Sequence, residues 1–211
     1  MEPVIIRKLS SQSGDRTQAA NQKVARKCIS DPRLLSVIVS HMNSSDQRLV
    51  ADCSEVMTIV AQEKPDLVIP FIPEILPLIH HTFTKIRWEI THTLFIAARI
   101  IPDIISQVLP DLLQIIQKDK SMIVRDYSIS TICAYAGTSK HAAEDAYPCL
   151  LEALQIWGEK HAARVMEGLL AVSMHKPAYK NEIMYIAEGY TGSLRVTVRK
   201  AARKLFREIQ R

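Results

Sequence analysis

The chain has 211 residues, of which 47% are hydrophobic and 23% charged, and its formal net charge is +5. This length suits one domain with a sizeable core or a short array of repeats, and six glycines and ten prolines leave little material for loops or disorder. The N-terminus lacks the basic-then-apolar order of a signal peptide, and no apolar run reaches the roughly 18 residues of a membrane span. We therefore expect a cytoplasmic protein without a membrane span.

Apolar residues recur at spacings of three and four along nearly the whole chain, which predicts amphipathic helices and no strand. Residues 1–13 are expected to form an N-terminal cap segment. The predicted helix pairs that follow are 15–29 with 32–42, 46–62 with 66–80, 84–100 with 103–117, 121–136 with 142–157, and 160–175 with 178–189, and a last helix covers 193–210. Pro70, Pro73 and Pro77 should kink the helix at 66–80 or delay its start.

Two landmarks repeat along these pairs. An arginine lies near the start of successive helices, and prolines are expected to open the partner helices. The arginines are Arg16, Arg48, Arg87, Arg125, Arg164 and Arg195, and the prolines are Pro73, Pro110 and Pro148. A guanidinium at a helix start can bond the carbonyls of the preceding turn and a carboxylate such as Asp119, so a structural role is expected for Arg87, Arg125 and Arg164.

The segment LPDLLQIIQ, followed by DKSMIVRD, resembles the HEAT-repeat pattern of a proline-led helix, an aspartate, and then Val-Arg opening the next unit. This armadillo-like resemblance covers residues 14–211, although Ile86-Arg87 and Ala163-Arg164 replace Val-Arg elsewhere. It implies an all-α, right-handed α-α superhelix of about five helix pairs plus a terminal helix, forming a single α-solenoid domain over 14–211. It also implies that first helices lie on the convex side and second helices line the concave side.

No motif for catalysis or for binding a cofactor is present in the sequence. His80, His81 and His92 lack the spacing of a zinc site, and the four cysteines occur without a CxxC pair, each where a buried free thiol is the usual state. The favoured hypothesis is a non-catalytic scaffold or adaptor that binds a protein partner on the concave face. The candidate contact residues are Gln107, Gln114, Lys118, Glu152, Gln155 and Glu182.

Basic charge is concentrated at the two ends of the chain, which supports an alternative function. Residues 1–30 contain six basic and two acidic groups, and residues 191–211 contain seven and one. The alternative is a nucleic-acid-binding protein that uses these ends. The terminal candidates for an anionic partner are Arg199, Lys200, Arg203, Lys204, Arg207 and Arg211, and the N-terminal cluster is Arg7, Lys8, Lys23, Arg26 and Lys27.

The nucleic-acid alternative includes a DNA-repair enzyme, because HEAT-like alkylpurine DNA glycosylases combine tryptophans with an acidic residue. Here Trp88 is next to Glu89, and Trp157 is near Glu159 and His161, although packing between helices also accounts for these residues. A third interpretation is head-to-tail self-association, in which the basic ends attract the acidic middle of another copy.

Overall fold

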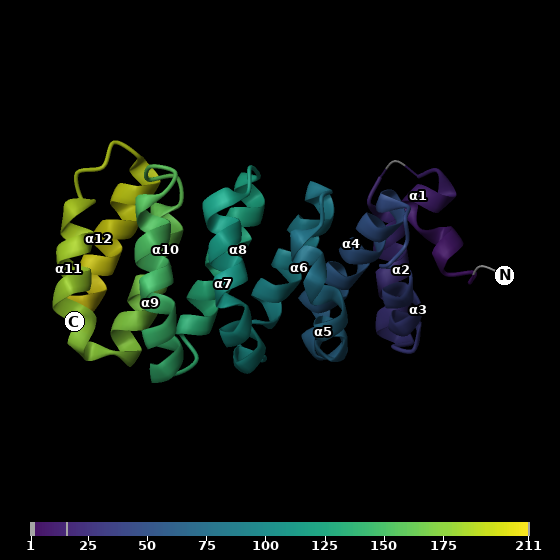
Figure 1. The fold of residues 1–211 in the computed structure, drawn as a ribbon, viewed down its shortest axis with the longest axis horizontal. Coiled ribbons are helices and arrows are strands. Elements are labelled where there is room, and N and C mark those ends of the chain that lie inside the picture. The colour runs from purple at the N-terminus through teal and green to yellow at the C-terminus, as the bar shows by residue number, and fades with distance from the viewer. Residues whose placement is uncertain (1–2, 16, 211) are drawn as a thin grey trace. The chain divides into compact units, whose positions relative to one another are not determined.

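The fold is all-helical, as predicted. In the computed structural model, which describes residues 3–15 and 17–210, every regular element is an α-helix or a 3-10 helix (Figure 1). The chain divides into Met1–Ala97 (unit 1) and Ala98–Arg211 (unit 2), and the single domain over 14–211 stays a prediction. No helix within the described ranges has the length and apolarity of a membrane span. Arg16 and Arg211, which belong to the predicted arginine sets, lie outside the described residues.

Unit 1 begins with two short helices that precede its longer ones. Helix α4 contacts both α2 and α6, and Asp46 caps its start by accepting hydrogen bonds from the N–H groups of Arg48 and Leu49 at 2.9 and 3.3 Å. The predicted cap segment at 1–13 contains the first two elements. The elements of unit 1 are η1 (Ile6–Lys8), α1 (Ser10–Ser13), α2 (Ala19–Ser30), α3 (Leu34–Ser40), α4 (Gln47–Glu63), η2 (Pro65–Leu67), η3 (Ile69–Phe71), α5 (Ile72–Ile75), η4 (Leu76–His80) and α6 (Thr84–Ala97).

The helix predicted at 66–80 is a series of short helices. Each of η2, η3, α5 and η4 has a proline in its first turn. Proline has no N–H to donate, so it is well placed at a helix start and interrupts a helix that has already begun. The expected effect of Pro70, Pro73 and Pro77 is therefore confirmed, and Pro73 opens a helix as predicted.

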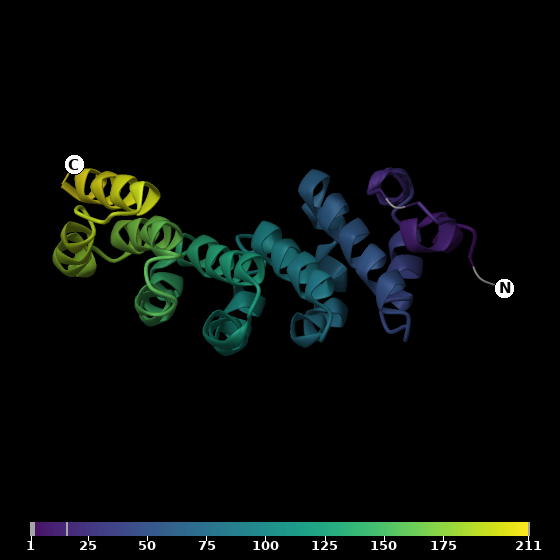
Figure 2. The ribbon, with the colours of Figure 1, turned by 90° about the horizontal axis from the view of Figure 1, so that it is seen from above.

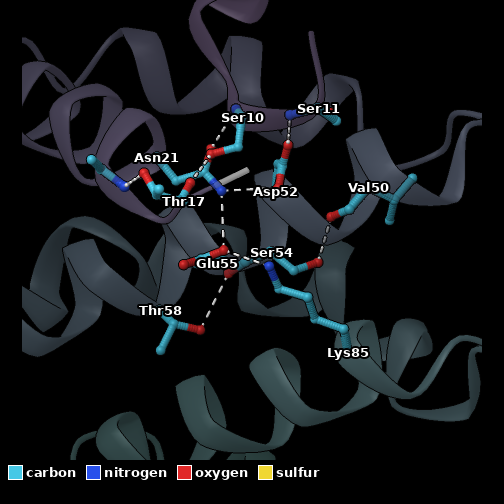
Figure 3. Close-up of polar contacts among 11 residues, drawn as sticks. Ser10, Ser11, Thr17, Asn21, Val50, Asp52, Ser54, Glu55, Thr58 and Lys85 are labelled. Carbon is cyan, nitrogen blue, oxygen red and sulfur yellow. Dashed lines mark hydrogen bonds and ion pairs between the residues drawn. The ribbon is translucent and has the colours of Figure 1, made fainter. Parts of the chain in front are cut away.

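A buried polar network holds the N-terminal segment of unit 1 onto α2 and α4 (Figure 3). Asn21 accepts from the backbone N–H of Ser10 at 3.0 Å, and its amide nitrogen donates to Asp52 and Glu55 at 2.9 and 3.0 Å. Asp52 also accepts from the backbone N–H of Ser11 at 2.6 Å. Because buried polar groups are stable only with partners, this network fixes the position of the N-terminal segment.

The network continues from α4 to α6 (Figure 3). The Lys85 ammonium donates to Glu55 at 2.6 Å. The Thr58 hydroxyl lies 3.0 Å from both the backbone oxygen of Glu89 and the hydroxyl of Thr93. Burial raises the pKa of Glu89 to about 7, and the nearby Glu55 carboxylate raises it further while Thr58 and Lys85 oppose the rise. Carboxylates therefore occupy the polar centre of unit 1.

Unit 2 consists mainly of long helices joined by short turns. The prediction that Pro110 and Pro148 open helices is wrong, because α7 already begins at Pro102 and α9 at Lys140. Both inner prolines are exposed, so water can reach the backbone carbonyl that loses its partner. The elements of unit 2 are α7 (Pro102–Lys118), α8 (Met122–Ala136), α9 (Lys140–Gln155), α10 (Ala162–His175), η5 (Pro177–Tyr179), α11 (Lys180–Gly189) and α12 (Val196–Gln210).

The helices of unit 2 form two layers with different spacing (Figure 2). Helices α8, α10 and α12 pack directly side by side, whereas α9 and α11 of the other layer barely touch. Helices crowd together on the inner side of a bent stack, so the inner face of this unit belongs to α8, α10 and α12. The expectation that second helices, here α7, α9 and α11, line the concave face is therefore wrong for unit 2.

Gly168 marks a close approach of α10 to α8 and α9. A Cβ atom at this position would lie 2.6 Å from Cys133 Sγ and 2.9 Å from Leu150 Cδ1. No larger side chain fits unless these neighbours move, so glycine allows the close packing of the inner layer.

Three arginines make the same backbone contact at the starts of α6, α8 and α12. Each donates from its guanidinium to the carbonyl oxygen of the residue six positions earlier, which ties the helix to the turn before it. The donor and acceptor pairs are Arg87 with His81 at 2.7 Å, Arg125 with Asp119, and Arg199 with Ser193 at 2.7 Å. The structural role predicted for Arg87 and Arg125 is confirmed.

The arginine series needs two corrections. Arg164 is exposed and lies 3.5 Å from Glu167, so it does not make the contact predicted for it. The equivalent residue on the last helix is Arg199 and not Arg195, because Arg199 donates to the preceding turn. The feature that repeats is therefore an arginine six residues after the carbonyl that accepts its hydrogen bond in the preceding turn.

All four cysteines are free thiols. Burial raises the pKa of Cys28 to about 11 and those of Cys53 and Cys133 to about 12, and it also raises the pKa of Cys149. Thiolate formation is suppressed at every cysteine.

Candidate functional site

The polar residues predicted to contact a partner on second helices lie on three helices of unit 2. They are exposed, except for the half-buried Glu152, which accepts a hydrogen bond from Gln117. Since these helices form the more widely spaced layer, the residues belong to the outer layer of the unit. Their role in binding stays a prediction. Gln107, Gln114 and Lys118 lie on α7, Glu152 and Gln155 on α9, and Glu182 on α11.

The histidines considered as zinc ligands do not form a cluster. His81 accepts a hydrogen bond from the backbone N–H of Phe83 at 3.0 Å, which fixes the turn before α6. Within residues 3–15 and 17–210, no three His, Cys, Asp or Glu side chains come close enough to hold a metal ion.

Trp157, which is 38% exposed, belongs to a polar junction between α8 and the turn before α10, where Arg125 and His161 are buried. Its indole N–H donates to the carbonyl of Ile116 at 2.7 Å, and the Arg125 guanidinium lies 4.0 Å from its ring centroid. Arg125 Nε donates to His161 Nε2 at 3.0 Å, and His161 Nδ1 lies 2.7 Å from Asp126 Oδ1. This arrangement requires the tautomer in which Nδ1 of His161 donates to Asp126.

The same junction fixes an unusual backbone conformation. Trp157 has a φ of 63°, in the left-handed region, and it is followed by Gly158 with a φ of 46°. Burial lowers the pKa of Arg125, and the carboxylates of Asp119 and Asp126 oppose this effect. Because all these side chains are used within the protein, Trp157 and His161 have a structural role at this junction.

Trp88 and Glu89 lie on α6 in unit 1, so they belong to a different unit from Trp157. Glu89 is buried with a pKa raised to about 7, and the indole N–H of Trp88 is a buried donor with no hydrogen-bond partner among the residues that the structure describes. Glu159 accepts from the hydroxyl of Ser193, which places it at the turn before α12. These tryptophans and carboxylates are therefore divided between two packing environments.

The N-terminal basic cluster does come together in the structure. Helices η1 and α2 bring its five members around a cavity of about 860 Å³ in unit 1, which we call the N-terminal pocket. The cluster is visible in the sequence, but only the fold shows that its members surround an apolar floor of Ala20, Val24 and Leu34. The pocket is lined by Arg7, Lys8, Ser13, Asp15, Ala20, Lys23, Val24, Arg26, Lys27, Ser30, Asp31 and Leu34.

The basic residues of the last helix separate into two groups. Arg199 is half-buried and donates to Ser193, so one of its nitrogens is used in the fold. Lys200, Arg203, Lys204 and Arg207 are exposed on the face of α12 opposite its buried apolar stripe. Among the described residues, no ion pair joins Lys200, Arg203 or Lys204 to a carboxylate. The buried stripe is Val198, Ala202, Leu205 and Ile209.

Two cavities flank α12, and Lys204 lines both. The first, of about 540 Å³, contains Phe206 between basic residues and Thr191. The second, of about 450 Å³, contains Leu170 and Met174, and the Met174 side chain is 74% exposed. These apolar residues could not be recognised from the sequence, because they come from α10 and from the flank of α12. We define the α12 surface as Leu170, Met174, Lys200, Arg203, Lys204, Phe206 and Arg207.

Comparison with known proteins identifies the fold. No protein-family model matches the sequence, and no curated protein matches it significantly. The designed armadillo repeat protein YIII(Dq)4CqI has a TM-score of 0.74 at 13% identity, and the match covers 99% of this chain and 100% of that chain. The chain has an armadillo-like repeat fold.

Two further solved structures with this fold are also similar to the chain. A structure described as computationally designed armadillo repeat proteins for modular peptide recognition matches with a TM-score of 0.74 at 14% identity, covering 99% of each chain. The designed protein YIII(Dq.V1)4CPAF, in complex with the peptide (KR)4, matches with a TM-score of 0.74 at 15% identity, covering 97% of this chain and 99% of that chain. At these identities the likeness establishes the armadillo-like fold alone.

Proposed function

We propose that this armadillo-like chain is a non-catalytic scaffold that binds an acidic segment of a protein partner on the α12 surface. The observation on which the proposal depends is the position of Lys204 between two cavities that expose apolar side chains. Cations beside apolar pockets suit a segment with alternating carboxylates and large apolar side chains.

The charge of α12 and its place in unit 2 also support an acidic protein partner. Like charges four residues apart on a helix repel each other, so Arg203 and Arg207 destabilise α12 slightly until an anionic partner neutralises them. The residues of the α12 surface lie on α12 and α10, which pack against each other in the inner layer of unit 2. Repeat folds commonly use such extended surfaces for binding, and the similar designed proteins include one in complex with a basic peptide. Because the α12 surface is basic, we expect its partner to be acidic.

Nucleic acid is the second candidate for this surface. The row Arg199, Arg203 and Arg207 could follow a phosphate backbone, as the basic ends of the sequence indicate. A phosphate backbone would leave Met174 uncovered, however, and the half-buried Phe206 offers little area for base stacking. A protein segment covers both the charged and the apolar parts of the surface, so we favour it.

Fluorescence anisotropy with three labelled probes tests this choice. The probes are a 20-residue helical peptide of glutamate and leucine with leucines at i, i+3, i+4 and i+7, the same peptide with lysine in place of glutamate, and a 20-base-pair DNA duplex. We expect the acidic peptide to bind with a Kd of about 10 μM or tighter and the lysine peptide to bind at least about tenfold more weakly. Failure of the acidic peptide to bind at low salt contradicts the proposal.

Variants of the α12 surface make the test specific. The double variant Arg203→Glu with Lys204→Glu should weaken the acidic peptide at least about tenfold, and Met174→Ser should weaken it about threefold. The matched control is Lys120→Glu with Lys140→Glu, which makes the same charge change at exposed sites of unit 2. If DNA binds more tightly than the acidic peptide and Met174→Ser has no effect, the surface is a nucleic-acid site instead.

A further inference from the structure

The N-terminal pocket lies in unit 1 and takes no part in the function proposed above. Its rim is basic, with Arg7 and Lys8 from η1 facing Lys23, Arg26 and Lys27 from α2. Its floor is apolar and comes from Ala20, Val24 and Leu34. Its volume of about 860 Å³ lies within the roughly 300–1,000 Å³ typical of small-molecule sites.

The basic rim is held in place by the fold. Ile5, Ile6 and Leu9 are buried on both sides of Arg7 and Lys8, so the backbone of η1 is anchored. Immediately after η1, Ser10 and Ser11 donate backbone hydrogen bonds to Asn21 and Asp52 (Figure 3). The two basic side chains of η1 are therefore presented over α2 from a fixed backbone.

The five cations that line the pocket outnumber its two lining carboxylates, Asp15 and Asp31. Lys8 and Lys27 line the same cavity, and the Lys8 ammonium lowers the pKa of Lys27. Asp31 is paired with Arg33 at 2.8 Å, whereas Asp15 accepts from the Thr17 backbone and hydroxyl at 2.8 Å and lies near Lys23, so neither carboxylate is paired with Lys8 or Lys27. An anion between Lys8 and Lys27 would remove their mutual repulsion.

We propose that the N-terminal pocket binds a phosphate monoester with an apolar body, with the phosphate between Lys8 and Lys27 and the body over Val24 and Leu34. A phosphate monoester supplies close to two negative charges and three acceptor oxygens, which matches two adjacent ammonium groups better than a single carboxylate does. The apolar floor accounts for the remainder of the ligand, because inorganic phosphate would leave it exposed to water. The phosphate can belong to a free small molecule or to a lipid headgroup.

Calorimetry with three probes and vesicle sedimentation, both on the full chain, test the site. Octyl phosphate, used below its micelle concentration, should bind one per chain, while inorganic phosphate and octyltrimethylammonium should each bind at least about tenfold more weakly. Equal binding of octyltrimethylammonium, or no heat with octyl phosphate, overturns the proposal. Vesicles containing phosphatidic acid separate the two sources: sedimentation of the protein with them supports a lipid headgroup, and octyl phosphate binding without sedimentation supports a free ligand.

Substitutions locate the site. The double variant Lys8→Ala with Lys27→Ala should weaken octyl phosphate at least about tenfold, and both residues are exposed, so the fold should be retained. The variant Leu34→Asn should weaken octyl phosphate and leave inorganic phosphate unchanged. The control variant Lys120→Ala with Lys140→Ala should stay within about twofold of the native protein. Equal loss in the control and the Lys8 and Lys27 variant would assign the binding to general surface charge and overturn the proposal.

Discussion

The two units stabilise their interiors with polar groups of opposite charge. In unit 1, Asp52, Glu55 and Glu89 are buried. Asn21 donates to Asp52 and Glu55, Lys85 donates to Glu55, and Thr58 is the hydrogen-bond partner of Glu89. In unit 2, the buried ion is the Arg125 guanidinium, whose partners are a carbonyl, an imidazole and an indole ring. One repeat architecture therefore tolerates either sign of charge at its helix junctions, provided that the buried charge has hydrogen-bond partners.

The largest expected effect comes from removing the buried cation of unit 2. Arg125→Ala leaves His161 Nε2 and the Asp119 carbonyl without their donor and removes the cation above Trp157. We expect the free energy of unfolding to fall by about 3 kcal/mol, measured by urea unfolding. Arg164→Ala, at the exposed arginine on α10, should change it by less than about 0.5 kcal/mol. Equal effects of the two substitutions would mean that Arg125 does not hold the junction.

The next largest effect should come from the network of unit 1. Asn21→Ala deprives Asp52, Glu55 and the Ser10 N–H of one hydrogen bond each, so stability should fall by about 2 kcal/mol. Hydrogen exchange should also become faster at residues 5–13, because this network fixes that segment. The substitution Asn43→Ala, at an exposed asparagine, provides the comparison. Unchanged exchange at residues 5–13 would show that the segment is held by its apolar contacts alone.

A smaller effect, of opposite sign, is expected from Glu89→Gln. Because burial raises the Glu89 pKa from its ordinary value of 4.5 to about 7, the folded protein keeps a proton that the unfolded chain releases between these values. Stability should therefore fall as the pH rises from about 4.5 to about 7 and change little through this group above that. Glu89→Gln should raise the stability at pH 8 by about 1–2 kcal/mol and leave it nearly unchanged at pH 4. Urea unfolding at both pH values checks this, and a loss of stability at pH 8 would show that the charged form is favoured.

The smallest effect should come from Lys85→Met. The Lys85 side chain is one-third exposed, and Glu55 keeps its hydrogen bond from Asn21, so the loss should be about 0.5–1 kcal/mol. Raising the salt concentration should reduce the difference between this variant and the native protein. A loss as large as that of Arg125→Ala would mean that the pair in unit 1 is as important as the guanidinium in unit 2.

The long helices could be predicted from the sequence because apolar residues recur in them at spacings of three and four without prolines that divide them. The predicted helix at 121–136 corresponds to α8 (Met122–Ala136), and the one at 46–62 corresponds to α4 (Gln47–Glu63). The roles of Pro110 and Pro148 could not be predicted in this way, since a proline on an exposed face bends a helix that has already begun. The assignment of Arg195 in place of Arg199 had a signal that could have corrected it, namely the six-residue distance from turn to arginine.

The candidate sites were predicted only in part. Charge density at the chain ends indicated Lys8, Lys27, Arg203 and Lys204, because clusters of like charge are visible in any sequence. The apolar neighbours of these residues come from other helices, so Leu34 and Met174 could be recognised only when the helices were assembled. The candidate contact residues on α7, α9 and α11 were chosen because second helices were expected to line the concave face. Which helices form the inner face depends on how closely they pack in three dimensions, and apolar spacing does not contain that information.

The suppressed thiols have a practical consequence for experiments on this chain. Since the pKa values of Cys28, Cys53 and Cys133 lie at about 11 to 12, maleimide reagents at pH 7 should react slowly with the native cysteines. A cysteine introduced at the exposed Ser13, on the rim of the N-terminal pocket, would react much faster. A dye attached there would report ligand binding. The native cysteines would not have to be replaced before this single site is labelled.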